Sequence, residues 1–232
     1  MPEGFEKVTH CLFDMDGLLL NTEHIYTQIT KQILEEQRCD EKYTGDVKVT
    51  LMGGQSNEVA NAIIKRYNLS MTVDELLARQ RELASNLMPT AELLPGVEKL
   101  LHHLSSHNVP IALATSSSKM MYDLKTVRHT KLFELFDHKV YGSSDPEVLH
   151  GKPAPDIFIV AARRFPDQPS PSKCLVFEDA PNGVKAAVAA NCQVVMVPED
   201  YVTAEMRKEA TLVVNSLEDF KPELFGLPAF DN

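Results

Sequence analysis

Short apolar runs alternate with amphipathic stretches from residue 94 to near the end of the chain, and this alternation constrains the fold most strongly. Val97, Leu100, Leu101 and Leu104 recur at helical spacing, and an apolar run at 109–115 follows them as a candidate strand. Further helices are expected at 119–128, 155–165, 181–190 and 203–210, and further strands at 139–142, 173–178, 193–197 and 211–214. Strands separated by helices pair in parallel. We therefore expect an α/β fold, a doubly wound parallel sheet with helices on both faces.

Residues 22–90 follow a different pattern, with helical periodicity at 23–38, 57–67 and 72–87 and no convincing strand between these stretches. A segment of this size suits a small domain. We therefore expect a core domain of residues 1–21 and 91–232, with an all-helical cap domain of residues 22–90 inserted after the first strand. An insert joined to the core at two crossings is typical of a lid.

Charge and composition exclude several classes of partner. A net charge of −10 disfavours binding to a nucleic acid polymer or an anionic membrane surface. No signal-peptide core is apparent, and no apolar run approaches the ~20 residues that span a bilayer. Cys11, Cys39, Cys174 and Cys192 lack zinc-binding spacing and are typical of free thiols in a reducing compartment. We therefore expect a cytoplasmic protein whose partners include neither a nucleic acid polymer nor a membrane. We also expect a monomer, although no sequence pattern indicates the oligomeric state.

Asp14 and Asp16 end the first apolar run of the chain and are followed by Gly17. Residues two apart in a strand point to the same face, so the two carboxylates would repel unless a cation, a proton or separate roles reconcile them. Ligands of open α/β sheets bind at the carboxyl ends of the strands. One carboxylate can then act as nucleophile and the other as acid and base beside a divalent cation. An ordinary acidic turn is the alternative.

Thr115, Ser116 and Ser117 lie at the end of the next predicted strand, where hydroxyl groups and the N–H groups of a helix start can bind an anion. Plain helix capping explains these residues equally well. Lys152 lies between Gly151 and Pro153 and is suited to a phosphoryl oxygen or an aspartate, although a single lysine is usually a solvated surface residue.

Glu178 and Asp179 close the apolar run that begins at Cys174. Acidic residues are unusual at the end of such a run unless they bind something, and Mg²⁺ prefers carboxylate oxygens. The alternative is that their charges favour the start of the helix that follows.

An acid pair, a hydroxyl, a lysine and a second acid pair, each after its own strand, are typical of a magnesium-dependent phosphoryl-transfer site. The ordered set resembles the motifs of the haloacid dehalogenase-like (HAD) superfamily of phosphatases, and the resemblance covers essentially the whole chain. The matching residues are Asp14, Asp16, Thr115, Lys152, Glu178 and Asp179. The resemblance implies a Rossmann-like core and identifies the helical insert with the small cap domain of that family.

The same resemblance implies a mechanism through an aspartyl-phosphate. Asp14 would attack the phosphorus, and Asp16 would protonate the leaving group and then deprotonate water. Thr115, Ser116 and Lys152 would bind the transferred phosphate. Mg²⁺ would be held by Asp14, the main-chain oxygen of Asp16 and Asp179, with Glu178 counted among the metal-site residues.

Longer stretches at 150–158, 174–183 and 215–228 resemble the part of the family that acts on pseudouridine 5′-phosphate. The cap segment 51–56 is expected to select the substrate. Alternatives are a phosphatase of a sugar phosphate or glycerol 3-phosphate, and a phosphomutase of the β-phosphoglucomutase type. A module that binds phosphoryl groups without turnover is disfavoured, since no motif residue is missing.

Two positions depart from the pattern of related enzymes. Tyr26 stands where β-phosphoglucomutases carry a histidine, which favours hydrolysis over mutase activity. Asn21 replaces an aspartate of many relatives and removes a charge near the hinge.

Overall fold

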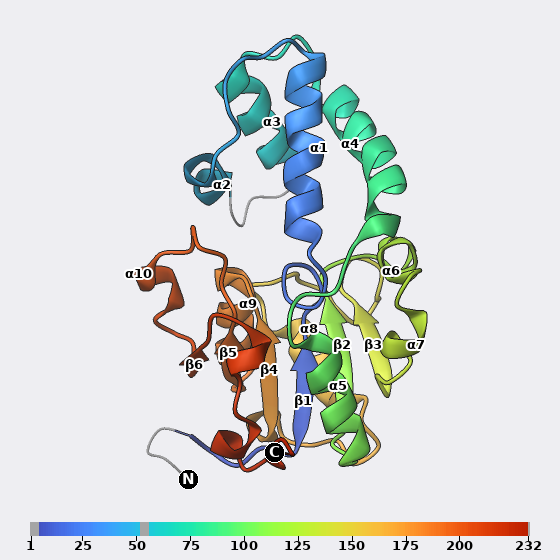
Figure 1. Cartoon of the computed structure of the whole chain (residues 1–232), viewed down its shortest axis with the longest axis vertical. Coiled ribbons are helices and arrows are strands. Elements are labelled where there is room, and N and C mark those ends of the chain that lie inside the picture. Colours follow the sequence, from blue (N-terminus) through green and yellow to red (C-terminus); the bar gives the residue numbers. More distant parts are fainter. Residues whose placement is uncertain (1–4, 52–55, 232) are drawn as a thin grey trace. The chain divides into compact units, whose positions relative to one another are not determined.

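The structure is a computed structural model that describes residues 5–51 and 56–231. Two compact units make up the chain, a core unit of Met1–Asn21 with Glu92–Asn232 and a helical unit of Thr22–Ala91. Figure 1 shows the elements of both units in chain order by colour. Every helix in the described part of the chain is too short or too polar to span a bilayer.

A six-stranded parallel sheet forms the centre of the core unit, in the order β3-β2-β1-β4-β5-β6. The strands are β1 (His10–Phe13), β2 (Ile111–Thr115), β3 (His138–Tyr141), β4 (Cys174–Glu178), β5 (Gln193–Met196) and β6 (Leu212–Val213). Successive strands are added on one side of β1 up to β3 and on its other side from β4 onward. The point between β1 and β4 where this order switches is where open α/β sheets bind ligands. This order confirms the predicted doubly wound sheet.

The three central strands, β1, β2 and β4, are fully buried, which explains their apolar sequences. β1 pairs with β2 through Cys11 and Ile111 and with β4 through His10 and Cys174. All residues of β1, β2 and β4 are buried. A parallel strand covered on both faces needs a continuous apolar run, and such runs occur here rather than alternating patterns.

Helices of the core unit cover both faces of the sheet, with α5 in front and α8 behind in Figure 1. They are α5 (Val97–Ser106), α6 (Lys119–Thr126), α7 (Thr130–Phe133), α8 (Asp156–Arg163), α9 (Pro181–Ala189) and α10 (Ala204–Arg207). Short 3₁₀ turns lie at Pro171–Lys173, Leu217–Asp219 and Pro222–Phe225. The sequence pattern did not predict α7, because four residues are too few to show a helical period.

Four α-helices and a 3₁₀ turn are described in the helical unit: α1 (Thr22–Glu36), α2 (Gly45–Leu51), α3 (Ser56–Tyr67), α4 (Val73–Leu87) and Met88–Thr90. Ile25, Ile29 and Ile33 recur every four residues and form the buried face of α1, which packs against α4. The expected all-helical character is confirmed, while α2 was not predicted. Within the segment 51–56, which the sequence singles out for substrate selection, residues 52–55 lie outside the described residues.

The segments by which the chain leaves and re-enters the core unit are paired with each other. Asn21 donates its N–H to the carbonyl of Glu92 at 2.9 Å, and Leu94 donates to Leu19 at 3.0 Å. A β-bridge also joins Leu20 to Leu93. Both ends of the insertion are therefore fixed side by side within the core unit.

Candidate active site

The expected site residues gather at one edge of the sheet because the strands are parallel. Asp14 follows β1 directly, and its N–H donates to the carbonyl of Phe177 at 3.0 Å. Thr115 and Glu178 are the last residues of β2 and β4, the two strands that flank β1. The carboxyl ends of the three central strands thus bring these residues together, as the sequence predicts.

Lys152 is the link between the two acidic motifs. Its side chain is 8% exposed, and its Nζ donates to Asp14 Oδ1 at 2.5 Å and to Glu178 Oε1 at 2.7 Å. A third contact joins Nζ to the carbonyl of Ala114 at 3.1 Å. Three contacts use all three donors of an ammonium group, so the lysine is fixed among the ends of β1, β2 and β4. The peptide bond from Lys152 to Pro153 is cis.

Glu178 is buried and both of its carboxylate oxygens are engaged. Oε1 accepts from Lys152, while Oε2 accepts from the N–H groups of Asp179 at 3.1 Å and Ala180 at 3.2 Å. These N–H groups precede the first turn of α9, where a negative charge is favoured by the helix dipole. A Cβ at Gly183 would lie 1.8 Å from Oε1, so α9 carries glycine where the carboxylate packs against it.

Burial raises the pKa of Asp14 to about 7, with the nearby carboxylates of Glu178 and Asp16 adding to the effect and Lys152 opposing it. Burial also lowers the pKa of Lys152, but Asp14 and Glu178 outweigh it and raise this pKa above its usual range. At this edge of the sheet, burial and the carboxylates of Glu178 and Asp16 therefore outweigh the effect of Lys152 on the pKa of Asp14.

Asp16 is held by Ser117, which belongs to the hydroxyl motif after β2, and by Lys125, which no sequence motif includes. Its Oδ1 accepts from Lys125 Nζ at 2.6 Å and its Oδ2 accepts from Ser117 Oγ at 2.8 Å. Lys125 also donates to Ser117 Oγ at 2.9 Å, which closes a triangle. No local sequence pattern marks Lys125, which is buried near the end of α6.

Thr115 and Ser116 are placed at the start of the loop that leads into α6. Thr115 is buried, and its Oγ1 accepts from the N–H of Ser117 at 3.1 Å. The N-cap of α6 is Ser118, whose hydroxyl accepts from Met121. Helix capping, the alternative considered for Thr115 and Ser116, is thus provided by another residue.

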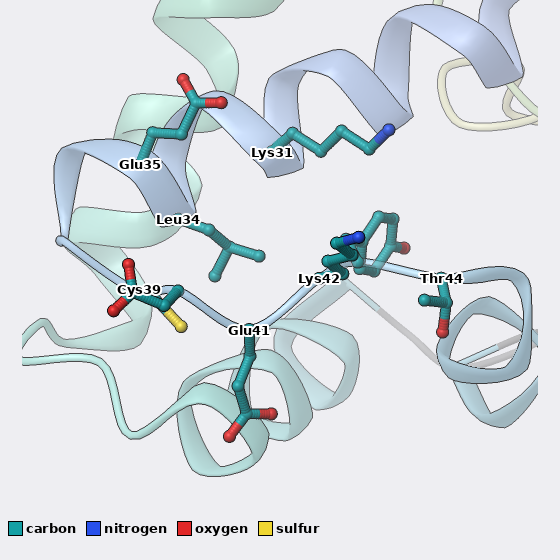
Figure 2. A pocket seen from close by; sticks show the side chains of 9 residues that line it. Lys31, Leu34, Glu35, Cys39, Glu41, Lys42 and Thr44 are labelled. Carbon is teal, nitrogen blue, oxygen red and sulfur yellow. The ribbon is translucent and has the colours of Figure 1, made fainter.

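Two pockets lie within single units. One of about 270 Å³ in the core unit is lined in part by Ser116 and Lys152. The other, of about 500 Å³, lies in the helical unit and is shown in Figure 2. Figure 2 shows Lys31 and Glu35 on α1 and Cys39 and Glu41 on the segment after it. We place the candidate site in the core unit, because the pocket of the helical unit is lined by none of the candidate site residues that the sequence identifies.

A divalent cation fits the donor set at the edge of the sheet. Three carboxylates gather there (Asp14, Asp16 and Glu178) against the ammonium groups of Lys125 and Lys152, and Asp179 follows Glu178 directly in the chain. No group of three or more His, Cys, Asp or Glu side chains within the described residues is arranged to hold a metal ion. Mg²⁺ usually takes only one or two protein carboxylates and completes its shell with water and substrate phosphate, so a small side-chain set suits it.

Known proteins similar to this chain identify its family. A model of the haloacid dehalogenase-like hydrolases matches residues 11–197. A probable pseudouridine-5′-phosphatase of Drosophila melanogaster is 54% identical over 224 residues, covering 97% of this chain and 96% of that protein. The (DL)-glycerol-3-phosphatase 2 of Arabidopsis thaliana is 44% identical over 232 residues, covering 99% and 95%. A putative β-phosphoglucomutase from Thermotoga maritima superimposes with a TM-score of 0.73 at 26% identity, covering 94% and 97%.

The fold, the strand-end site and these matches define a hydrolase with a Rossmann-like core. The chain belongs to the haloacid dehalogenase-like hydrolase family. It is an enzyme of the phosphatase type within that family, as the motif order predicted.

Proposed function

We propose that this enzyme hydrolyses a small phosphomonoester through an aspartyl-phosphate on Asp14 and requires Mg²⁺. The observation that carries the proposal is the ion-paired arrangement of Asp14, Lys152 and Glu178 between β1 and β4, where the strand order of the sheet switches. A buried carboxylate fixed beside a lysine is oriented for attack, and the lysine can also stabilise charge on the transferred group.

The reaction takes two steps. In the first, a carboxylate oxygen of Asp14 bonds to phosphorus, the ester P–O bond breaks, and Asp16 gives a proton to the leaving oxygen. In the second, Asp16 takes a proton from water, the water oxygen bonds to phosphorus, and the bond from phosphorus to Asp14 breaks. Inorganic phosphate leaves and both carboxyl groups return to their starting states.

Three residues would bind the phosphoryl oxygens during transfer. Lys152 supplies a positive charge, and the hydroxyl of Thr115 keeps its proton for donation because it accepts from Ser117. Ser116 lines the same pocket as Lys152 and completes the set. Fixed donors of this kind stabilise the charge that develops in phosphoryl transfer.

Asp14, the main-chain oxygen of Asp16 and Asp179 would hold the metal ion. Bound Mg²⁺ would neutralise charge on the phosphate and on the crowded carboxylates. Glu178 has both oxygens engaged by Lys152 and the start of α9, so we assign it to the positioning of Lys152 rather than to direct metal binding.

Pseudouridine 5′-phosphate is the substrate we propose, supported by the 54% identical relative from Drosophila melanogaster. Glycerol 3-phosphate is the second candidate, because the 44% identical Arabidopsis thaliana relative is a glycerol-3-phosphatase. Activity of the mutase type is disfavoured by Tyr26. The monomeric state and the cytoplasmic location stay predictions.

The test uses purified enzyme with Mg²⁺ and a panel of pseudouridine 5′-phosphate, uridine monophosphate, glycerol 3-phosphate and a hexose phosphate, with phosphate release as the readout. The proposal expects the first substrate to have the highest kcat/KM. In parallel, Asp14→Asn should fold normally and release no phosphate above background. Substantial turnover by this variant would rule out Asp14 as the nucleophile.

A further inference from the structure

Lys125 is a fully buried lysine outside the matched family motifs. Its side chain has 0% exposure, whereas lysines are almost never fully buried unless they are paired. Its Nζ lies 2.6 Å from Asp16 Oδ1 and 2.9 Å from Ser117 Oγ. The burial of this charge therefore serves a contact with Asp16 and with the loop after β2.

A purely structural reason for Lys125 accounts for only part of this arrangement. A cation near the C-terminal end of α6 is favoured by the helix dipole, but an exposed lysine satisfies that preference equally well. Lys119 on the same helix shows the ordinary case, since its pair with Asp123 lies in solvent with both side chains more than half exposed. The dipole thus explains the sign of the charge but not its burial against Asp16.

The contacts fix the rotation of the Asp16 carboxyl group. Each of its oxygens accepts from a separate donor, Lys125 Nζ at 2.6 Å and Ser117 Oγ at 2.8 Å. Ser117 accepts from Lys125 while it donates to Asp16, so the three groups hold one another in place. In this arrangement the orientation of the Asp16 carboxyl group is fixed.

We propose that Lys125, together with Ser117, is a positioning residue that holds Asp16 as the base for the second step, hydrolysis of the aspartyl-phosphate. This inference rests on the proposed function and adds a separate claim about one step. Asp14 and Asp16 lie two residues apart, yet each has its own lysine, Lys152 and Lys125. Separate cations allow the two carboxylates to keep distinct roles rather than share one proton.

The test separates the two steps with p-nitrophenyl phosphate, whose leaving group departs without an acid. Lys125→Met keeps an unbranched side chain in the buried space, and Ser117→Ala removes only a hydroxyl. Both should show a burst of nitrophenolate near one equivalent of enzyme, a kcat lowered ~10–100-fold, and a kcat/KM within about threefold of the parent. Lys119→Met, the exposed lysine of the same helix, should show none of these changes.

Asp16→Asn is the reference that separates the two claims. A burst in Asp16→Asn but in neither Lys125→Met nor Ser117→Ala would overturn the positioning role alone. No burst in Asp16→Asn would overturn the acid–base assignment and the positioning role with it. Equal losses of kcat and kcat/KM without a burst would show that Lys125 only supports the fold, and thermal unfolding of each variant identifies a folding defect directly. If Lys125→Met fails to fold, Ser117→Ala decides the question.

Discussion

Gly183→Ala should lower both stability and phosphatase activity, because the added methyl group on α9 would occupy the space of the Glu178 carboxylate. The new Cβ would lie 1.8 Å from Oε1, 1.9 Å from Cδ and 2.3 Å from Oε2. Non-bonded atoms do not approach so closely, so the carboxylate has to move by more than about 1 Å. An exposed glutamate would rotate away freely, but Glu178 is only 1% exposed and is held at both oxygens.

The cost follows from the contacts that the carboxylate would lose. The bonds from Lys152, Asp179 and Ala180 are each worth ~1.5–3 kcal/mol as hydrogen bonds to a charged group, or about 4.5–9 kcal/mol together. Alanine is better than glycine inside a helix by about 1 kcal/mol. The net loss is therefore about 3.5–8 kcal/mol if all three bonds are lost, and at ~2–4 °C per kcal/mol for a chain of this size the Tm should fall by at least about 7 °C.

The measurements are thermal unfolding and phosphatase activity in the same buffer. Lys152 would lose one of its two carboxylate partners, so kcat should fall at least ~10-fold even at a temperature where the variant is folded. Gly151→Ala is the matched control for stability, since a Cβ there meets no atom within 4 Å. Its Tm should change by about 2 °C or less.

A double-mutant cycle with Glu178→Ala decides whether the clash is the cause. Once the glutamate side chain is gone, Gly183→Ala should cost little or add the helix preference of alanine. An equal loss of stability in both backgrounds would refute the reasoning, because the damage would then come from another part of α9.

Three further outcomes follow from the structure. Removal of divalent metal with EDTA should abolish phosphatase activity, and added Mg²⁺ should restore it and raise the Tm; activity that persists without metal would contradict the metal assignment. The folded-state pKa of Asp14, raised from 3.8 to about 7, means that the folded protein retains a proton which the unfolded chain releases. The stability of metal-free enzyme should therefore carry a component that falls as pH rises from about 4 to about 7, and Asp14→Asn should lack this component in urea unfolding. In the helical unit, Thr72 and Glu75 form a reciprocal capping box on α4, so Thr72→Ala should lower stability by ~1 kcal/mol while Thr72→Ser should retain it in the same assay.

Much of the core fold was predictable because its strands are buried on both faces. β1, β2 and β4 are largely apolar runs. β2 and β4 end at a polar residue and β1 is followed directly by one, and these residues mark the edge of the sheet. The order of those polar residues along the chain was enough to anticipate which ones would meet. By contrast, α2 and α7 were not predicted, because seven and four residues give too little periodicity to read.

The supporting residues of the site were harder to foresee. Lys125 and Gly183 are common residue types in ordinary helices, and only their three-dimensional neighbours give them a role. Glu178 was expected beside the metal, but the sequence could not show that Lys152 and the N–H groups before α9 would occupy both of its oxygens. Contacts between groups distant in sequence depend on the packed structure rather than on local pattern.

The pairing of Asn21 with Glu92 and of Leu19 with Leu94 holds the two ends of the insertion side by side. The core unit therefore does not require a particular length of chain between them. Joining two ends that already lie side by side costs an entropy that grows only with the logarithm of the connecting length. Replacing roughly 70 residues by about five changes that term by only ~2 kcal/mol. Insertions of very different size at this junction are therefore compatible with one core, which can be conserved while the inserted segment changes in length.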